Sequence, residues 1–391
     1  MMGSTSLSLI ALVVAFIIGA PRPSVAQQPI RVGASIAITG ASVIQGGYVR
    51  EGYLLCQKHV NEQGGVLGRP MELLIRDDGS NPNTAVGLYE TLITEDKVDA
   101  VMGPYGSPIT DAVADVTEKH RKLMVAPTAG TTSIWEKGRR YLIMVLSPLE
   151  ASTAGTIDLA ARHGLKTIGL IDARARPAIV KGALELAKKQ GLEVVVHEAY
   201  PPGTTDFSAM LNKVKAAKPD VLVAGAPPSD AIAMTRQMRE LDVNVKMFGA
   251  TPGGSLPDYY KGLENTAEFV YAGSYWEPGL PYPGNREFVA AYQQEFTRAP
   301  SFYSAASYAG CQLFADAVKR AGSLDADKLR EALLQLKTQT VIGDFAVDER
   351  GFQVGHRAST IQWQDGRAVV VWPDAVATGK PRFPTPPWSQ R

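Results

Sequence analysis

Residues 101–116 join an apolar strand to a helix through a turn of small residues, and this turn could bind an anion. The segment reads VMGPYGSPITDAVADV and places Tyr105, Gly106 and Ser107 in the turn. The first backbone N–H groups of a helix have no partner inside the helix, and the helix dipole adds partial positive charge at that end. The turn therefore favours a phosphate, a reacting carbonyl group or a carboxylate.

The motifs around the turn separate these three possibilities. A phosphate-binding turn would carry G-x-x-x-x-G-K-[ST] or G-x-G-x-x-G, and GPYGSPIT matches neither pattern. The chain has no G-x-S-x-G nucleophile motif, and its five histidines form no H-E-x-x-H zinc motif. We therefore expect a bound carboxylate, with no catalytic residue, no metal and no cofactor.

Strands and helices alternate around this turn, which predicts an α/β fold. Strands are expected at 30–38, 71–78, 99–104 and 122–128, with helices at 49–65, 83–95 and 107–120. The alternation begins again after 144–148, with strands at 167–172, 193–200, 220–227 and 245–251. The two halves also share a pattern, because KVDAVMGPYGSPITDAVADV in the first resembles KPDVLVAGAPPSDAIAMTRQM in the second. We therefore expect two domains of one topology.

Parallel α/β sheets bind ligands at the carboxyl ends of their strands. Two such domains facing each other would place their turns around one cleft, with Ser107 on one wall and Pro228 on the other. A strand-like run at 270–278, helices at 285–298 and 304–321, and the runs 340–351 and 360–373 complete the two domains.

The overall composition limits the partners. The chain has 391 residues, enough for two domains, and Lys+Arg 40 against Asp+Glu 39 leaves a formal charge of +1. Nucleic acid or an anionic membrane surface would favour a basic excess, so we expect neither as the main partner.

The N-terminal segment has the pattern of a secretory signal. An uncharged apolar stretch from about residue 7 to residue 20 precedes Pro21 and the small-residue site Ser24-Val25-Ala26. We expect cleavage after Ala26 and a soluble mature protein outside the cytoplasm. No lysine or arginine precedes the apolar stretch, so an uncleaved anchor is the alternative.

The chain has two cysteines, Cys56 and Cys311, too few for a cysteine-rich scaffold. An oxidising compartment permits one disulfide between them. The alternative is two small apolar residues buried on separate helices.

Six segments, taken in order, resemble the periplasmic solute-binding proteins of ABC importers, in the branched-chain amino-acid-binding group. They are RVGASIAITG, NEQGGVLGRPMELLIRDDGSNPNTAV, DAVMGPYGS, KLMVAPTAGTTS, TDFSAMLNKVKAAKPDVLVAG and TVIGDFAVDERG. The resemblance implies the type I fold, with two doubly wound parallel-sheet lobes joined by three crossover strands. It implies an N-terminal lobe of 27–147 and 275–348, and a C-terminal lobe of 148–274 and 349–391. It also implies a monomer that closes over a small ligand and delivers it to membrane permease subunits.

The resemblance assigns the carboxylate contact to Ser107. The alternative is that Ser107 only caps its own helix, with Pro108 at the first helical position. Thr128 and Gly130 match a second carboxylate-binding loop, with Ala129 and Thr131 beside them. The alternative for this loop is a hydroxyl turn that caps the next helix.

Two departures from the family pattern concern the ligand's positive end. Amino-acid binders of this group have an acid after a strand of the second lobe, and here that position is Thr251. The family's aromatic turn in this lobe has become Pro227-Pro228. A buried ammonium without a carboxylate partner would cost several kcal/mol. We therefore expect a ligand without an α-amino group.

The remaining candidates concern the ligand's body. Tyr303 matches a position that packs on the ligand side chain, and Gln45 replaces a cleft aromatic. Arg176 follows a strand of the second lobe and could pair with a second anionic group; the alternative is that it is solvated. Tyr105 and the pair Tyr275-Trp276 add aromatic surface, although each could be an ordinary core residue. We expect a small aromatic or apolar carboxylate as the ligand. The alternatives are a branched-chain amino acid or amide, a ligand-sensing receptor subunit on the same fold, and an amidase- or esterase-like enzyme.

Overall fold

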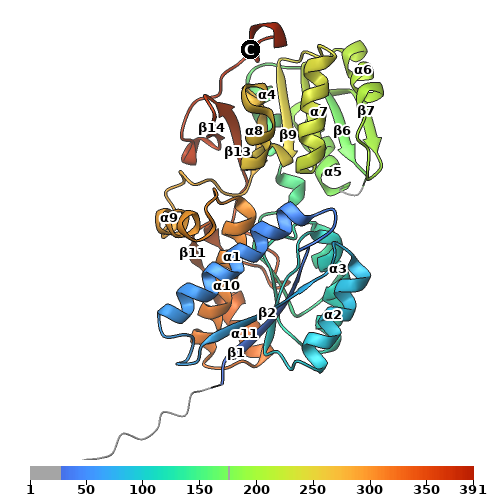
Figure 1. The fold of residues 1–391 in the computed structure, drawn as a ribbon. Helices are drawn as coiled ribbons and strands as arrows, with labels where there is room; N and C mark the ends of the chain where they lie inside the picture. Colours follow the sequence, from blue (N-terminus) through green and yellow to red (C-terminus); the bar gives the residue numbers. More distant parts are fainter. Residues whose placement is uncertain (1–27, 175–176) are drawn as a thin grey trace, which may run out of the picture.

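The structure is a computed structural model that describes residues 28–174 and 177–391. The chain forms two lobes stacked end to end, with several segments passing between them (Figure 1). The expected signal segment and its cleavage site after Ala26 lie outside the described residues. Within the described ranges we find no helix that combines the length and the hydropathy of a membrane span.

A five-stranded parallel sheet forms the centre of the first lobe, with strand order β2-β1-β3-β4-β5. Its strands are β1 (Ile30–Ile36), β2 (Met71–Asp77), β3 (Ala100–Met102), β4 (Met124–Ala126) and β5 (Leu142–Met144). The last three are buried along their whole length, as the apolar runs AVM, MVA and LIM predict for parallel strands covered on both faces.

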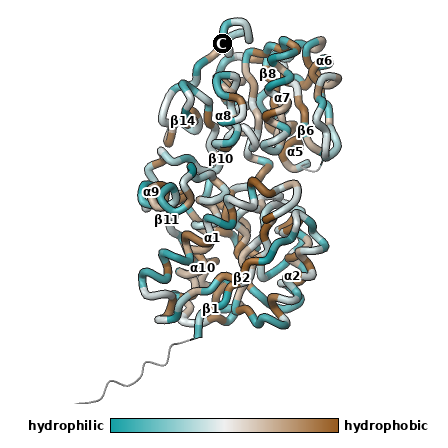
Figure 2. Tube along the Cα trace, in the orientation of Figure 1, coloured by the Kyte–Doolittle hydropathy of each residue, from teal (hydrophilic) through white to brown (hydrophobic). Residues whose placement is uncertain are grey.

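Helices cover both faces of this first sheet. One side carries α1 (Val43–Glu62), α9 (Asn285–Phe296), α10 (Phe302–Ala321) and α11 (Ala326–Gln335), and the other carries α2 (Pro82–Thr94) and α3 (Ser107–Lys119). A short hairpin of β11 (Thr338–Thr340) and β12 (Gly343–Phe345) joins the α9–α11 side. Figure 2 shows hydrophobic residues within the lobes and hydrophilic residues along the outer helix α9.

A seven-stranded sheet forms the second lobe, with strand order β14-β13-β10-β9-β8-β6-β7. Its strands are β6 (Thr167–Ala173), β7 (Glu193–Tyr200), β8 (Val221–Ala226), β9 (Met247–Pro252), β10 (Tyr271–Ser274), β13 (Ser359–Gln364) and β14 (Arg367–Trp372). The first five pair in parallel, whereas β13 and β14 add an antiparallel hairpin at one edge. This hairpin is a departure from the all-parallel sheet that the sequence predicts.

Helices also cover both faces of the second sheet. They are α4 (Ala154–Arg162) and α5 (Pro177–Gln190) on one face, and α6 (Ser208–Ala217), α7 (Pro228–Glu240) and α8 (Pro257–Leu263) on the other. Both lobes are therefore doubly wound, as predicted.

Several predicted bounds were wrong. α1 begins at Val43, six residues before the predicted start at Val49, and the Gly46-Gly47 pair therefore lies inside the helix. A Cβ on Gly46 would lie 2.0 Å from the Ala37 carbonyl oxygen, so glycine lets the helix pack on the turn before it. The strand predicted at 270–278 stops at Ser274, since the residues that follow pass to the other lobe.

The two cysteines form a disulfide between α1 and α10. The Cys56 and Cys311 sulfur atoms are 2.02 Å apart, and the two residues are separated by 255 positions in the sequence. The bond joins the two helices that pack together on one face of the first sheet.

Three segments pass between the lobes and meet at Ser147, Tyr275 and His356. The third segment stays on the first lobe beyond Asp348, because the Met144 N–H donates to the Gly351 carbonyl and Phe352 packs on Trp135. We therefore propose that the third crossing lies near His356, later in the chain than the lobe boundary between residues 348 and 349 that the resemblance implies.

Candidate functional site

A cavity of about 420 Å³ lies between the lobes, at the carboxyl ends of the first sheet's strands. Most of its described lining comes from the first lobe: the turns after β1 to β4, and the start of α10. The segments that pass between the lobes contribute Ser147 and Tyr275, and the second lobe contributes Pro177 and Pro252.

Helix α3 begins at the cavity wall. Gly106 is its N-cap, with φ 85° and ψ 151°, a backbone conformation that is essentially restricted to glycine. Gly106, Ser107 and Ile109 all line the cavity. Among the described residues the N–H groups of Ser107 and Ile109 have no hydrogen-bond partner, as expected in a first helical turn. They and the helix dipole can hold an anion.

The Ser107 side chain does not cap α3, which was the alternative interpretation, because the N-cap is Gly106 and no side chain caps the helix. Instead, Ser107 Oγ accepts hydrogen bonds from the N–H groups of Gly130 and Thr131, each at 3.2 Å. With its acceptor sites used by backbone donors, the hydroxyl retains its own proton to donate. A carboxylate, which only accepts, suits this donor.

The loop after β4 forms the adjacent wall and supports Ser107. Thr128, Gly130 and Thr131 line the cavity, but the Thr128 hydroxyl donates to the Pro104 carbonyl at 3.1 Å and so joins the two loops. Thr131 precedes the short 3-10 helix Thr132–Lys137 without a side-chain cap bond, so the capping alternative was wrong for this loop as well. Ala129 is fully buried and is not among the described lining residues.

Aromatic side chains form a further part of the wall. Tyr105 and Tyr303 are each 4% exposed, with hydroxyl oxygens 3.3 Å apart and rings edge to face at 5.2 Å. Phe302 packs against both Tyr303 and Tyr275, and all four rings line the cavity. Trp276 is instead a core residue, and its Nε1 donates to Asn285 Oδ1 at 2.8 Å. Such a wall favours an apolar or aromatic ligand body.

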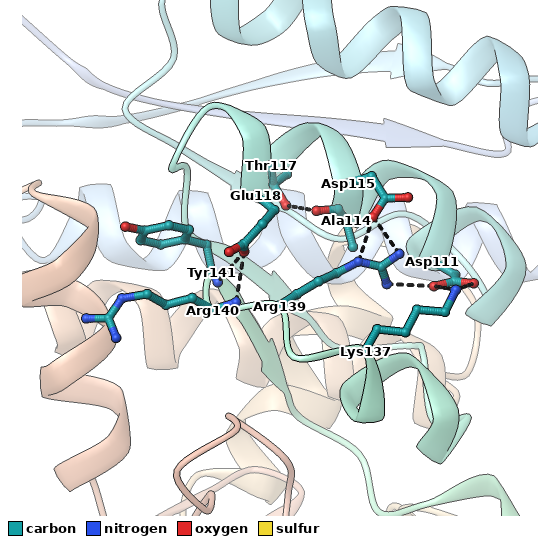
Figure 3. Close-up of polar contacts among 9 residues, drawn as sticks. All are labelled: Asp111, Ala114, Asp115, Thr117, Glu118, Lys137, Arg139, Arg140 and Tyr141. Atoms are coloured by element: carbon teal, nitrogen blue, oxygen red, sulfur yellow. Dashed lines mark hydrogen bonds and ion pairs between the residues drawn. The ribbon is translucent and has the colours of Figure 1, made fainter.

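Asp111 is the one acid in the described lining, and it is already paired (Figure 3). Its carboxylate accepts from Lys137 Nζ at 2.7 Å and from Arg139 Nη1 at 2.6 Å. Burial raises the pKa of Asp111, but the hydrogen bonds from Lys137 and Arg139 outweigh burial and lower it. No lysine, arginine or histidine occurs in the described lining, so its donors to an anion are neutral groups.

Other predicted site residues lie away from the described lining. Gln45 is 4% exposed within α1. Thr251 is fully buried in β9, where its Oγ1 accepts the Gly273 N–H at 2.9 Å. Pro228 is buried at the start of α7, and Pro252 lines the cavity from this part of the second lobe. Arg176 lies outside the described residues.

Several of the residues that line the cavity were not predicted from the sequence, among them Ser42, Ser80, Leu149, Pro252 and Phe302. Ser42 and Ser80 follow β1 and β2, and the Ser42 N–H donates to Ser80 Oγ at 3.0 Å. The position of these serines after parallel strands could have identified them. Phe302 is the first residue of α10, two residues before the predicted helix start at residue 304, and the resemblance pointed to its neighbour Tyr303 instead.

Comparisons with known proteins give a consistent result. A profile of the family described as periplasmic binding protein matches residues 29–368. The chain is 25% identical over 397 residues to Leu/Ile/Val-binding protein homolog 7 of Brucella abortus, covering 96% of this chain and 99% of the relative.

Solved structures match over most of the chain. The branched-chain amino acid substrate-binding protein LivJ of Streptococcus pneumoniae, in complex with isoleucine, has a TM-score of 0.81 at 23% identity, over 88% of this chain and 100% of that one. An ABC-transporter solute-binding protein of Rhodopseudomonas palustris, in complex with 3,4-dihydroxybenzoic acid, has a TM-score of 0.78 at 25% identity, over 87% of this chain and 95% of that one. The predicted two-lobed fold is confirmed by these likenesses.

Proposed function

Because the chain belongs to the periplasmic binding protein family, we propose that it captures a small aromatic or apolar carboxylate without an α-amino group. It delivers this ligand to the permease subunits of an ABC importer. The N-terminal segment directs export and is cleaved after Ala26, and the mature protein works in the periplasm as a monomer. The family is one of solute-binding proteins and not of enzymes.

The main support for the proposal is that the described lining offers partners to a carboxylate but no available acid to an ammonium group. The start of α3 and the Ser107 hydroxyl offer neutral donors to a carboxylate. The described lining offers no acid to an ammonium group, because Asp111 is held by Lys137 and Arg139. An ammonium desolvated here without a partner would cost several kcal/mol, whereas an uncharged group would not.

The size and the walls of the cavity support the choice of ligand body. About 420 Å³ is within the range of small-molecule sites, and the four aromatic rings provide apolar surface for a planar or branched group. The complex of the Rhodopseudomonas palustris protein with 3,4-dihydroxybenzoic acid is compatible with an aromatic acid.

A titration followed by intrinsic fluorescence tests the proposal, since Tyr275 and Tyr303 line the cavity. The panel contains benzoate, 3-phenylpropanoate, leucine and isoleucine. We expect saturable changes with at least one aromatic acid and none with the two amino acids. Tight binding of leucine or isoleucine with no response to either aromatic acid would refute the proposed ligand.

A second candidate, a branched-chain amino acid, is favoured by the names of the relatives and by one side chain. Glu150 Oε1 accepts the Thr132 N–H at 3.2 Å, and its buried Oε2 has no hydrogen-bond partner among the described residues. Glu150 is next to the lining residue Leu149, so it is the acid that we would expect to accept an ammonium. If leucine binds, Glu150→Gln should weaken it; if an aromatic acid binds, Glu150→Gln should leave its affinity unchanged.

A further inference from the structure

The three segments that pass between the lobes meet at one buried histidine. His356 is 5% exposed and belongs to the third segment. Its Nδ1 accepts the backbone N–H of Ser147, in the first segment, at 3.0 Å, and the Ser147 hydroxyl oxygen lies 3.1 Å from the same nitrogen. Its Nε2 lies 2.9 Å from the backbone carbonyl of Tyr275, in the second segment. These two partners define a neutral ring that accepts at Nδ1 and donates at Nε2.

A glutamine fixes the backbone that carries this ring. Gln353 Oε1 accepts the N–H groups of Gly355 at 2.8 Å and His356 at 3.1 Å. Its Nε2 donates to the Val145 carbonyl at 2.8 Å, which ties the third segment to the first one before the Ser147 contact. Gln353 is 2% exposed, so these bonds are made away from water.

Both partners of His356 are cavity residues, whereas His356 is not in the described lining. Ser147 and Tyr275 line the cavity from two different segments. The Tyr275 ring also stacks on the His356 ring, with centroids 6.2 Å apart and an interplanar angle of 22°. A change in the angle between the lobes must move the segments that pass between them, and His356 links all three.

We propose that His356 is a positioning residue that fixes the relative placement of the three segments, and thereby sets both the angle between the lobes and the position of Ser147 and Tyr275 at the ligand. The affinity effect rests on the proposed function, but the effect on the lobe angle does not. An apolar residue at this site would fill the volume while leaving a buried N–H and a buried carbonyl without partners.

Three variants distinguish the contribution of the bond to Ser147 from that of the bond to Tyr275. In His356→Asn the side-chain oxygen can replace Nδ1 and keep the Ser147 bond, and in His356→Gln the side-chain nitrogen can replace Nε2 and keep the Tyr275 bond. His356→Leu removes both bonds and also the contact of Nδ1 with the Ser147 hydroxyl. The matched control is His163→Leu, because the His163 ring also stacks on an aromatic ring, Phe383, but within the second lobe.

The decisive readout is the distribution of inter-lobe distances in the ligand-free protein. It is measured by pulsed electron spin resonance between two labels introduced on non-natural amino acids, one in each lobe, so that the native disulfide stays intact. We expect His356→Leu to broaden this distribution, His356→Asn and His356→Gln to broaden it less, and His163→Leu to leave it unchanged. If His356→Leu fails to fold, the Asn and Gln variants carry the test.

Affinity gives a second readout. We expect His356→Leu to weaken the aromatic acid found in the titration panel by about tenfold, which is about 1.4 kcal/mol. An unchanged distance distribution in all three variants, with only a lower melting temperature, would overturn the proposal and make His356 an ordinary core residue. If no acid in the panel binds the native protein, the proposed function fails while the distance measurement still decides the role of His356.

Discussion

The neighbours of Ser107 leave the proton of its hydroxyl available for the proposed contact with a ligand. Two backbone N–H groups already point at its oxygen, so the proton of the hydroxyl is the part left for a ligand. The resemblance to the family predicted this serine as a ligand contact, but the dependence of its hydroxyl on the loop after β4 was not predicted. That dependence comes from the pairing of β3 with β4, which brings two distant turns together.

Removing this hydroxyl should weaken the ligand. We expect Ser107→Ala to lower the affinity for the carboxylate by roughly 1–3 kcal/mol, because it removes one donor and leaves two backbone N–H groups without their acceptor. Calorimetric titration measures the effect. Ser229→Ala is the control, since Ser229 is an exposed serine in the matching turn of the second lobe and its hydroxyl donates to Asp230. Equal affinities for Ser107→Ala and the native protein would remove Ser107 from the site.

The buried imidazole should make stability depend on pH. Burial lowers the pKa of His356 to about 4, although the Tyr275 carbonyl and Asp344 both favour the charged form. In the unfolded chain a histidine titrates near about 6.5, so the unfolded state takes up the proton first. The contribution of His356 is therefore complete above pH ~6.5 and is lost as the pH falls toward ~4, by about 3 kcal/mol in total.

Urea unfolding at a series of pH values measures this dependence. The matched variant is His356→Gln, which does not titrate, so its stability should fall less steeply than that of the native protein between pH ~6.5 and ~4. Identical slopes for the two proteins would show that His356 does not carry the dependence.

At the scale of elements, the sequence predicted the strand–helix order well and the element ends less well. Apolar runs such as AVM and MVA identified β3 and β4, and their burial on both faces agrees with that pattern. The start of α1 was predicted six residues too late, in a stretch that contains Gly46 and Gly47, residues of low helix propensity. In the structure Gly46 allows a close approach to Ala37. Such an approach between separate elements is a tertiary constraint, which local propensity does not contain.

The disulfide should stabilise the packing of α1 on α10. We expect the double variant Cys56→Ala/Cys311→Ala to lose about 2–5 kcal/mol of unfolding free energy, because the bond restricts a long loop in the unfolded chain. Urea denaturation with and without a reductant provides the measurement, and the reductant should not affect the double variant. A native protein that unfolds at the same urea concentration in both conditions would contradict a stabilising disulfide.

At the scale of the whole molecule, the two-lobed arrangement was predictable because the two halves share a turn pattern. The contents of the cleft were less predictable: Gln45, Thr251 and Pro228 were chosen by position along the chain, and the structure buries them outside the described lining. A shift of one or two residues after a strand moves a side chain from the cavity to the core. This explains why Pro252 lines the cavity while Thr251 bonds within the sheet.

Ligand binding should make the molecule more compact. Beyond the first segment between the lobes, which ends near Leu149, the second lobe contributes Pro177 and Pro252 to the described lining, so a ligand held by the first lobe leaves most of the facing lobe free to approach. We expect the radius of gyration from small-angle X-ray scattering to decrease on saturation with the bound acid. Ser107→Ala at the same ligand concentration should show a smaller decrease. No change in the native protein at saturation would argue against closure.

A crystal structure of the protein with the tightest-binding acid of the panel tests the central claim most directly. We predict that the carboxylate lies within hydrogen-bond distance of Ser107 Oγ and of the N–H groups at the start of α3, with the apolar body against Tyr105, Tyr275 and Tyr303. A ligand bound with its carboxylate away from α3, or an amino acid whose ammonium is held by an acidic side chain in the cleft, would contradict the account.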